Sequence, residues 1–215
     1  LGDVYKRQSF YRCLEQEISS KRVTLGNLEQ AQLCLSRVFD AELARQAQVE
    51  GVRYLPLSST ECAQANRLKQ TLIDNLNVQA RMLPRFTPQR FELSIEPGQA
   101  IDYAGVRLMG RVDRIDIDAE HGHYVVIDYK GGIAGHDAGF DPDEQEGFRI
   151  PSKIQTLIYA QALRGVVESA RPAGALYLSY RAKEPARSIA GSFDSSMLDV
   201  CLLYTSPSPR DRSLS

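Results

Sequence analysis

The sequence contains no tryptophan, and its 215 residues include only 3 histidines and 4 cysteines. His121, His123 and His136 show no H-x-x-x-H spacing, and no two cysteines are spaced as C-x-x-C, so the patterns typical of a zinc site are missing. Neither a signal peptide nor a membrane-spanning segment is recognisable, and there is no internal repeat. These absences favour a globular, cytoplasmic protein without membrane partners.

Neither positive nor negative charge dominates the sequence. The 26 Lys and Arg residues are balanced by 27 Asp and Glu residues, which gives a formal net charge of −1 at pH 7. A strongly basic surface over the whole molecule is therefore excluded, although the acidic residues 141–146 leave room for local basic surface elsewhere. The hydrophobic content of 43% suits a globular domain with a substantial core. We expect Cys13, Cys34 and Cys62 to be buried, reduced thiols.

The two ends of the chain have related coding sequences. Residues 1–8 and residues 201–207 can be translated from one nucleotide sequence read in opposite orientations, which indicates a transposon-type sequencing adapter. We therefore expect residues 1–8 and 201–215 to lie outside the core. The remainder is predicted to comprise a helical part of a domain, residues 9–83, and the core of that domain, residues 84–200, truncated at its C-terminus.

The periodicity of the apolar residues changes from helical to strand-like near Pro84. Helices are predicted over residues 9–18, 24–48, 58–83 and 152–168, and strands over residues 90–96, 103–118, 123–130 and 174–180. The stretch between the third strand and the last helix, residues 131–151, is rich in glycine and acidic residues, and we predict a mobile loop there. The order from the third helix onward is helix, three strands, helix and strand, which predicts an α/β fold with a mixed sheet flanked by helices.

Two strands carry the candidate site. Residues 119–122 read as a four-residue hairpin loop, and this register pairs positions whose numbers sum to 241, so Asp113 lies opposite Asp128. Directly opposed carboxylates repel unless a cation lies between them, and Mg²⁺, with Mn²⁺ as the alternative, is the expected cation. Lys130 shares the strand face of Asp128, where its charge can orient a water or stabilise a transition state.

Three segments together resemble the PD-(D/E)XK nuclease superfamily: "GRVDRID" (residues 110–116), "VIDYK" (residues 126–130) and "QTLIY" (residues 155–159). Among its members they resemble the RecB and AddB-type nuclease domain of helicase-nucleases that process DNA double-strand breaks. The resemblance implies a restriction-endonuclease-like core with the order α-β-β-β-α-β and an additional N-terminal helical region. It implies that Asp113 and Asp128 bind metal and that Lys130 is the active-site lysine. Gln155 and Tyr159 complete the implied catalytic set.

The sequence also departs from that family. These nucleases carry a histidine on the opening helix, before a run similar to "FYR" at residues 10–12, and this histidine would lie upstream of the adapter junction. Because the fragment would lack this residue, we expect nuclease activity from the intact full-length protein and not from the fragment alone. AddB-type members further hold an iron–sulfur cluster, with cysteines before that helix and after the last strand. Because those flanks lie outside residues 9–200, Cys13, Cys34 and Cys62 are not assigned to a cluster.

The expected function is Mg²⁺-dependent hydrolysis of DNA, exonucleolytic and linked to a helicase, in the repair of double-strand breaks by recombination. The expected partners are DNA and a helicase-nuclease subunit. One alternative is a catalytically inactive nuclease fold that binds DNA or scaffolds a subunit. A second alternative is a glycosidase with two carboxylates, which would need neither a metal nor Lys130.

Several charged residues near the three motifs can be interpreted in two ways. Asp116 and Asp118 are either exposed to solvent or paired with Arg114, and a role in metal binding is the weaker interpretation. Arg111 and Arg114 either contact phosphate or are outward-facing structural residues. Two further residues near the motifs, Lys153 and Glu92, either take part in the site or are structural, and neither is assigned to it.

Overall fold

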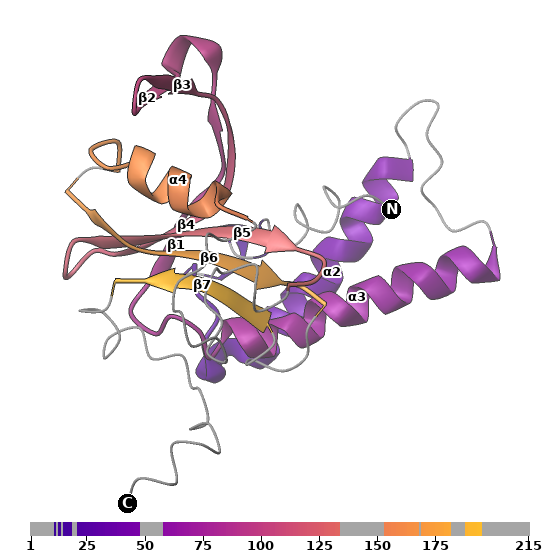
Figure 1. The fold of residues 1–215 in the computed structure, drawn as a ribbon. Helices are drawn as coiled ribbons and strands as arrows, with labels where there is room; N and C mark the ends of the chain where they lie inside the picture. Colours follow the sequence, from indigo (N-terminus) through magenta and orange to yellow (C-terminus); the bar gives the residue numbers. More distant parts are fainter. Residues whose placement is uncertain are drawn as a thin grey trace, which may run out of the picture. The chain divides into compact units, whose positions relative to one another are not determined.

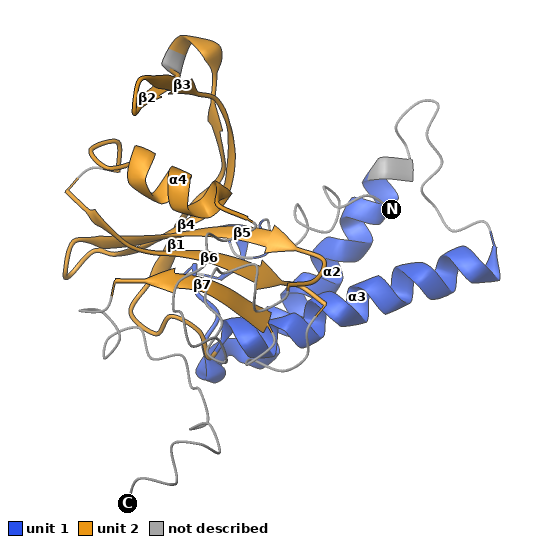
Figure 2. Ribbon diagram, viewed as in Figure 1, with its two compact units in different colours: residues 1–80 blue, residues 81–215 orange. Residues whose placement is uncertain are grey.

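The structure is a computed structural model. It describes residues 11, 13, 15–18, 21–47, 58–133, 153–167, 169–181 and 188–194. The predictions for residues 1–8 and 201–215 lie outside this part of the chain, as does most of the loop predicted over residues 131–151. The chain divides into two compact units, Leu1–Ala80 and Arg81–Ser215 (Figure 2).

The first unit is helical, as predicted. A short 3-10 helix, η1 (Leu25–Asn27), leads into α2 (Leu28–Ala47), and α3 (Ser59–Gln79) follows. Ser58, the residue before α3, forms a capping box with Glu61. The Ser58 hydroxyl accepts from the Glu61 N–H, and the Glu61 carboxylate accepts from the Ser58 N–H at 2.9 Å. The two long helices pack on each other, and Lys69 of α3 pairs with Asp40 of α2 at 2.6 Å.

The cysteine prediction holds for two residues and fails for the third. Cys13 and Cys34 are buried free thiols whose sulfur atoms lie 3.0 Å apart, and burial raises the pKa of the Cys13 thiol well above its usual value. Cys62 is exposed, because it lies in the first turn of α3, on a part of the helix that has little covering it. Within the described residues, no helix combines the length and the apolar character needed to cross a membrane.

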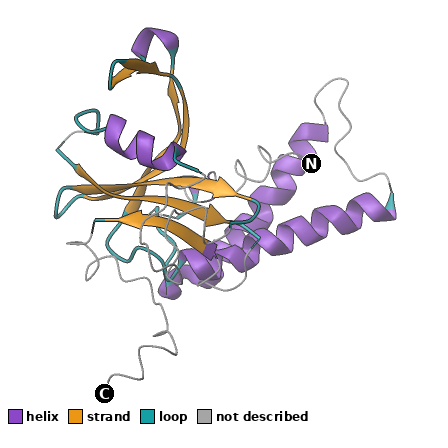
Figure 3. Cartoon of the chain, in the orientation of Figure 1, coloured by secondary structure: helices purple, strands orange, loops and turns teal. Residues whose placement is uncertain are grey.

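The second unit is built on a five-stranded mixed sheet in the order β1-β4-β5-β6-β7 (Figures 1 and 3). Neighbouring strands are antiparallel, except that β5 and β6 are parallel. The strands are β1 (Thr87–Ile95), β4 (Gly110–Asp118), β5 (His123–Lys130), β6 (Arg171–Ser179) and β7 (Ile189–Phe193). This mixed α/β architecture is the predicted fold class.

Two strand predictions need correction. The single strand predicted over residues 103–118 is divided, because Ala104 and Gly105 have φ values of +52° and +78° and turn the chain. A two-stranded hairpin results, β2 (Ile101–Tyr103) and β3 (Val106–Leu108), preceded by a 3-10 turn, η2 (Pro97–Gln99). The edge strand β7 was not predicted, since its short run of small residues has no clear alternation.

The connection between β5 and β6 determines where the last helix lies. Parallel neighbours cannot be joined by a tight turn, so the chain crosses over through α4 (Gln155–Ala162), which is shorter than the predicted helix. Figure 1 shows α4 on one face of the sheet, with the β2–β3 hairpin beyond it. The core between α4 and the sheet includes Ile115, Tyr124, Val126 and Leu163, and the Tyr124 hydroxyl donates to the Ala160 carbonyl at 2.6 Å.

Candidate active site

The C-terminal end of β5 holds an ion pair. Nζ of Lys130 lies 2.5 Å from Oδ2 of Asp128, and both side chains share one face of the strand because they are two residues apart. The Asp128 side chain is 12% exposed, whereas the Lys130 side chain is 30% exposed and lines a pocket. The lysine and the carboxylate of the second motif are therefore adjacent, as predicted.

Asp113 lies on the neighbouring strand, in the predicted register. The pairs between β4 and β5 run from Asp118–His123 to Arg114–Ile127, and the next residues along the two strands are Asp113 and Asp128. Asp113 is buried, and its Oδ2 accepts a hydrogen bond from the backbone N–H of Tyr129 at 3.0 Å. The carboxylate of Asp113 is thus held against the segment of β5 that carries Asp128 and Lys130.

The β4 strand is irregular at Asp113. Residues three apart in a regular strand face opposite sides of the sheet, yet Val112 and Ile115 pack in the same apolar cluster. On the adjacent strand β1, Glu92 has a φ of +50°, which is unusual for a residue other than glycine. This irregularity accompanies the contact between the Asp113 side chain and the backbone of β5.

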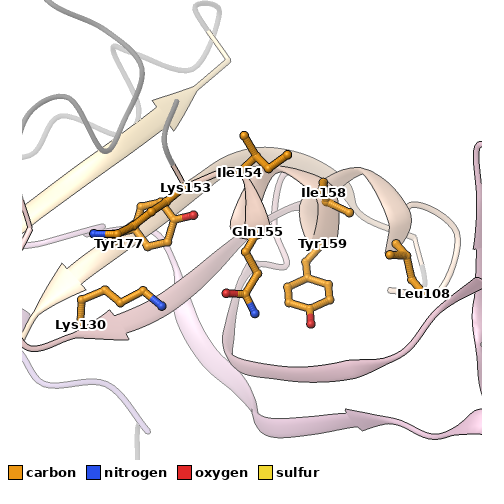
Figure 4. A pocket seen from close by; sticks show the side chains of 8 residues that line it. All are labelled: Leu108, Lys130, Lys153, Ile154, Gln155, Ile158, Tyr159 and Tyr177. Carbon is orange, nitrogen blue, oxygen red and sulfur yellow. The ribbon is translucent and has the colours of Figure 1, made fainter. Parts of the chain in front are cut away.

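The crossover brings the third motif to the same place. Since α4 follows β5 and runs back over the sheet, its first residues lie near the C-terminal end of β5. Gln155 and Tyr159, four residues apart, extend from the same side of α4, and the Lys130 side chain extends toward Gln155 (Figure 4). They share a pocket of about 420 Å³, whose lining residues are Leu108, Lys130, Lys153, Ile154, Gln155, Ile158, Tyr159 and Tyr177.

Tyr177 is a pocket residue that the sequence analysis missed. In the parallel register of β5 and β6 it lies directly beside Asp128, and the Lys130 ammonium lies 5.6 Å from the centre of its ring. Its hydroxyl also accepts from the Thr156 N–H at 3.5 Å, in the first turn of α4. The strand pattern of "GALYLSY" predicted β6, but the residue that meets Asp128 depends on the crossover and could not be read from that pattern.

A glycine connects the first and third motifs. Gly110, at the start of β4, has a φ of +147°, and a Cβ atom at this position would overlap the hydroxyl oxygen of Tyr159. Only glycine allows the strand to approach the tyrosine so closely. This contact places Tyr159 against the strand that carries Asp113.

Arg114 is not an outward-facing or phosphate-binding residue, because it is buried. Its guanidinium contacts both carboxylate oxygens of Asp116 at 2.5 Å and donates to the Tyr129 hydroxyl at 2.8 Å. Burial lowers the pKa of Arg114, but Asp116 and Tyr129 more than offset this effect, so the pKa is raised and the group stays charged. Asp116 is fully buried, so of its two expected environments the pairing with Arg114 is confirmed.

The remaining charged candidates lie in other environments. Asp118 is buried and contacts Arg85 at 3.2 Å and His121 at 3.1 Å, so it is neither exposed nor paired with Arg114. Arg111 pairs with Glu92 at 2.7 Å, on the exposed part of β1 and β4. Lys153, which the sequence left with two interpretations, lines the pocket.

The residues that would hold a hard divalent cation are Asp113 and Asp128. Asp113 and Asp128 supply carboxylates from adjacent strands, and no group of three or more His, Cys, Asp or Glu side chains gathers within the described part of the chain. Mg²⁺ is commonly held by one or two carboxylates, with waters and phosphate oxygens completing its octahedron, whereas a structural zinc site needs four protein ligands. When bound, such a cation polarises a phosphoryl oxygen and lowers the pKa of a bound water.

Comparison with known proteins identifies the family of the chain. Residues 8–204 match the PD-(D/E)XK nuclease superfamily, and this match spans both units of the structure. No curated protein matches the chain. The order of the motifs, the mixed sheet and the extent of the match lead to one conclusion: the chain belongs to the PD-(D/E)XK nuclease superfamily.

Proposed function

We propose that the protein is a Mg²⁺-dependent deoxyribonuclease in which Asp113 and Asp128 hold the metal. The observation that carries this proposal is the convergence of the three motifs around the C-terminal end of β5, where Lys130 faces a pocket. Asp113 contacts the backbone of β5, Asp128 pairs with Lys130, and Gln155 and Tyr159 line the pocket with Lys130. Mn²⁺ would serve as a substitute, because it has similar ligand preferences.

The side chains divide the work of phosphodiester hydrolysis. Lys130, partly exposed and next to Asp128, is placed to orient the attacking water and to stabilise the negative charge that develops on the phosphate oxygens. Gln155 and Tyr159 offer an amide and a hydroxyl for contacts with the DNA backbone. The water oxygen bonds to phosphorus as the bond between phosphorus and the leaving-group oxygen breaks. The proton released by the water is taken up by solvent or by the leaving-group oxygen.

The assignment to an exonuclease of double-strand-break repair rests on the sequence motifs. Their similarity to RecB and AddB-type nucleases supports exonuclease activity, a link to a helicase and its partner subunit, and a role in recombinational repair of double-strand breaks in the cytoplasm. In this assignment residues 9–83 form the helical part of the nuclease domain and residues 84–200 its core. An iron–sulfur cluster is not assigned to any cysteine of this chain.

Cleavage of end-labelled linear DNA and of circular DNA tests the proposal. The full-length protein, with the opening helix and its expected histidine included, should degrade linear DNA with Mg²⁺, lose this activity with a chelator, and leave circular single strands intact if it is an exonuclease. Asp128→Ala should abolish cleavage. Cleavage that persists in Asp128→Ala would overturn the mechanism, and metal binding without any cleavage by the unchanged protein would favour an inactive DNA-binding or scaffold domain.

A further inference from the structure

A charged network lies on the sheet face opposite the pocket. Tyr129 falls between Asp128 and Lys130 in β5, so its side chain points away from the face that these two residues share. On that opposite side its hydroxyl meets Arg114, which is paired with Asp116. Arg114, Asp116 and Tyr129 are 4%, 0% and 8% exposed, so the network is enclosed by protein.

The ion pair has a fixed geometry. Two nitrogens of the Arg114 guanidinium donate to the two oxygens of Asp116, each at 2.5 Å, and a third nitrogen donates to the Tyr129 hydroxyl at 2.8 Å. This planar, forked arrangement leaves the arginine little freedom to rotate. Because the desolvation of two charges costs about as much as their attraction returns, stability alone does not account for a buried pair of this kind.

Tyr129 transmits this fixed geometry across the sheet. Its side chain is anchored by Arg114, while its backbone N–H donates to Oδ2 of Asp113 at 3.0 Å. The same residue therefore connects the Arg114–Asp116 pair to one proposed metal ligand and lies next to the other, Asp128, in the chain. A shift of the Tyr129 ring would move the peptide group that orients the Asp113 carboxylate.

We propose that Arg114 and Asp116 are positioning residues which act through Tyr129 to set the orientation of the Asp113 carboxylate relative to Asp128. This inference rests on the proposed function, since it takes Asp113 and Asp128 as the metal ligands. It also explains why arginine and aspartate occur within "GRVDRID" at positions that do not reach the pocket. Residues that orient metal ligands in this way typically contribute about 10- to 100-fold to metal affinity or activity.

Binding of Mn²⁺ to the full chain, measured by calorimetry in the absence of DNA, tests the network without relying on catalysis. Tyr129→Phe keeps the ring and the peptide N–H but removes the acceptor of the Arg114 bond, and it should weaken Mn²⁺ binding by about 10- to 100-fold. Arg114→Lys keeps the charge but loses the fork, and it should weaken binding to a similar extent.

Tyr124→Phe is the matched control. Tyr124 lies on the same strand, is buried, and also makes one hydroxyl hydrogen bond, but to the Ala160 carbonyl of α4. Removal of the Tyr124 hydroxyl should lower the thermal unfolding temperature about as much as Tyr129→Phe does, while Mn²⁺ affinity stays unchanged. Equal Mn²⁺ affinities for folded Tyr129→Phe and Tyr124→Phe would overturn the positioning role.

Asp128→Ala distinguishes the proposed metal site from the positioning role of Arg114 and Asp116. If this variant binds Mn²⁺ as tightly as the unchanged protein, the proposed metal site is wrong. If Asp128→Ala loses binding and Tyr129→Phe does not, the metal site stands and only the positioning role fails.

Discussion

The ammonium group of Lys130 lies 2.5 Å from Oδ2 of Asp128, so the lysine and a metal cation would compete for one carboxylate. Lys130→Gln removes the competing charge while it keeps much of the side-chain length. We expect Mg²⁺ to bind more tightly to this variant, because a nearby positive charge disfavours a cation. Cleavage at saturating Mg²⁺ should nevertheless fall by about 100-fold or more, as expected for loss of a group that stabilises transition-state charge.

Calorimetric titration with Mg²⁺ and single-turnover cleavage measure these two effects separately. Weaker metal binding by Lys130→Gln would contradict the competition, and undiminished cleavage at saturating metal would contradict the role of the lysine.

Asp113→Asn tests the charge of the second carboxylate. The amide oxygen of asparagine still accepts from the Tyr129 N–H, so we expect the free energy of unfolding of the metal-free protein to change by about 1 kcal/mol or less. Loss of the negative charge should reduce Mg²⁺-dependent cleavage by about 100-fold or more. Urea unfolding and a cleavage assay over a range of Mg²⁺ concentrations measure the two quantities. Full activity at low Mg²⁺ would show that Asp113 is not a ligand.

Gly110→Ala tests the contact between the first and third motifs. The positive φ of +147° should cost about 1–3 kcal/mol for a residue other than glycine, and the new Cβ would overlap the Tyr159 hydroxyl and displace the tyrosine from the pocket. We expect lower stability and weaker cleavage. Gly105→Ala is the control, since Gly105 also has a positive φ but its added Cβ would meet no atom within 4 Å.

Tyr159→Phe, alone and combined with Gly110→Ala, forms a double-mutant cycle that tests the same contact. Removal of the hydroxyl removes the overlap, so the double variant should be more stable than the sum of the two single effects predicts. Additive unfolding free energies would mean that the strand and the tyrosine are not in contact.

The alkaline stability of the protein should depend on Tyr129. Burial raises the pKa of its hydroxyl to about 12, although Arg114 lowers it. Between pH 10 and pH 12 the unfolded chain releases a proton that the folded protein keeps, so the free energy of unfolding falls as the pH rises, by about 2 kcal/mol for this residue. Burial also raises the pKa of Tyr124 to about 12, so two residues contribute in this range.

Urea unfolding at several pH values, followed by circular dichroism, measures this dependence. Tyr129→Phe should flatten the curve between pH 10 and pH 12, and the additional change Tyr124→Phe should flatten it further. An unchanged slope in the double variant would indicate that neither hydroxyl is buried in the folded protein.

The parts of the site that sequence could predict are those determined by local pattern. Two strands joined by a four-residue loop have one register that buries their apolar residues, and the observed pairs from Asp118–His123 to Arg114–Ile127 follow that register, with Asp113 and Asp128 next along the two strands. The spacing of Gln155 and Tyr159 on a helix likewise follows from helical geometry. These features needed no knowledge of how distant segments pack.

The parts that were missed depend on tertiary structure. Pairing of Asp116 with Arg114 was one of two alternatives at the level of sequence, but nothing in the strand pattern indicated that Tyr129 would join the pair or that all three residues would be buried. Tyr177 reaches the site only because β6 pairs in parallel with β5. The turn at Ala104 was missed because a non-glycine residue takes a positive φ there.

The position of β5 in the sheet has a consequence for dynamics. It is the third of five strands, and its residues from His123 to Ile127 are paired with both β4 and β6, whereas the segment from Asp128 to Lys130 is paired in the ladder with β6 alone. A segment paired on both sides opens only when the surrounding sheet opens, and its amide protons exchange at a rate close to that of cooperative unfolding of the whole unit. The amide protons of the segment from Asp128 to Lys130 should therefore exchange before those of residues 123–127, and heating should disturb the arrangement of Asp128 and Lys130 below the temperature at which the sheet itself is lost.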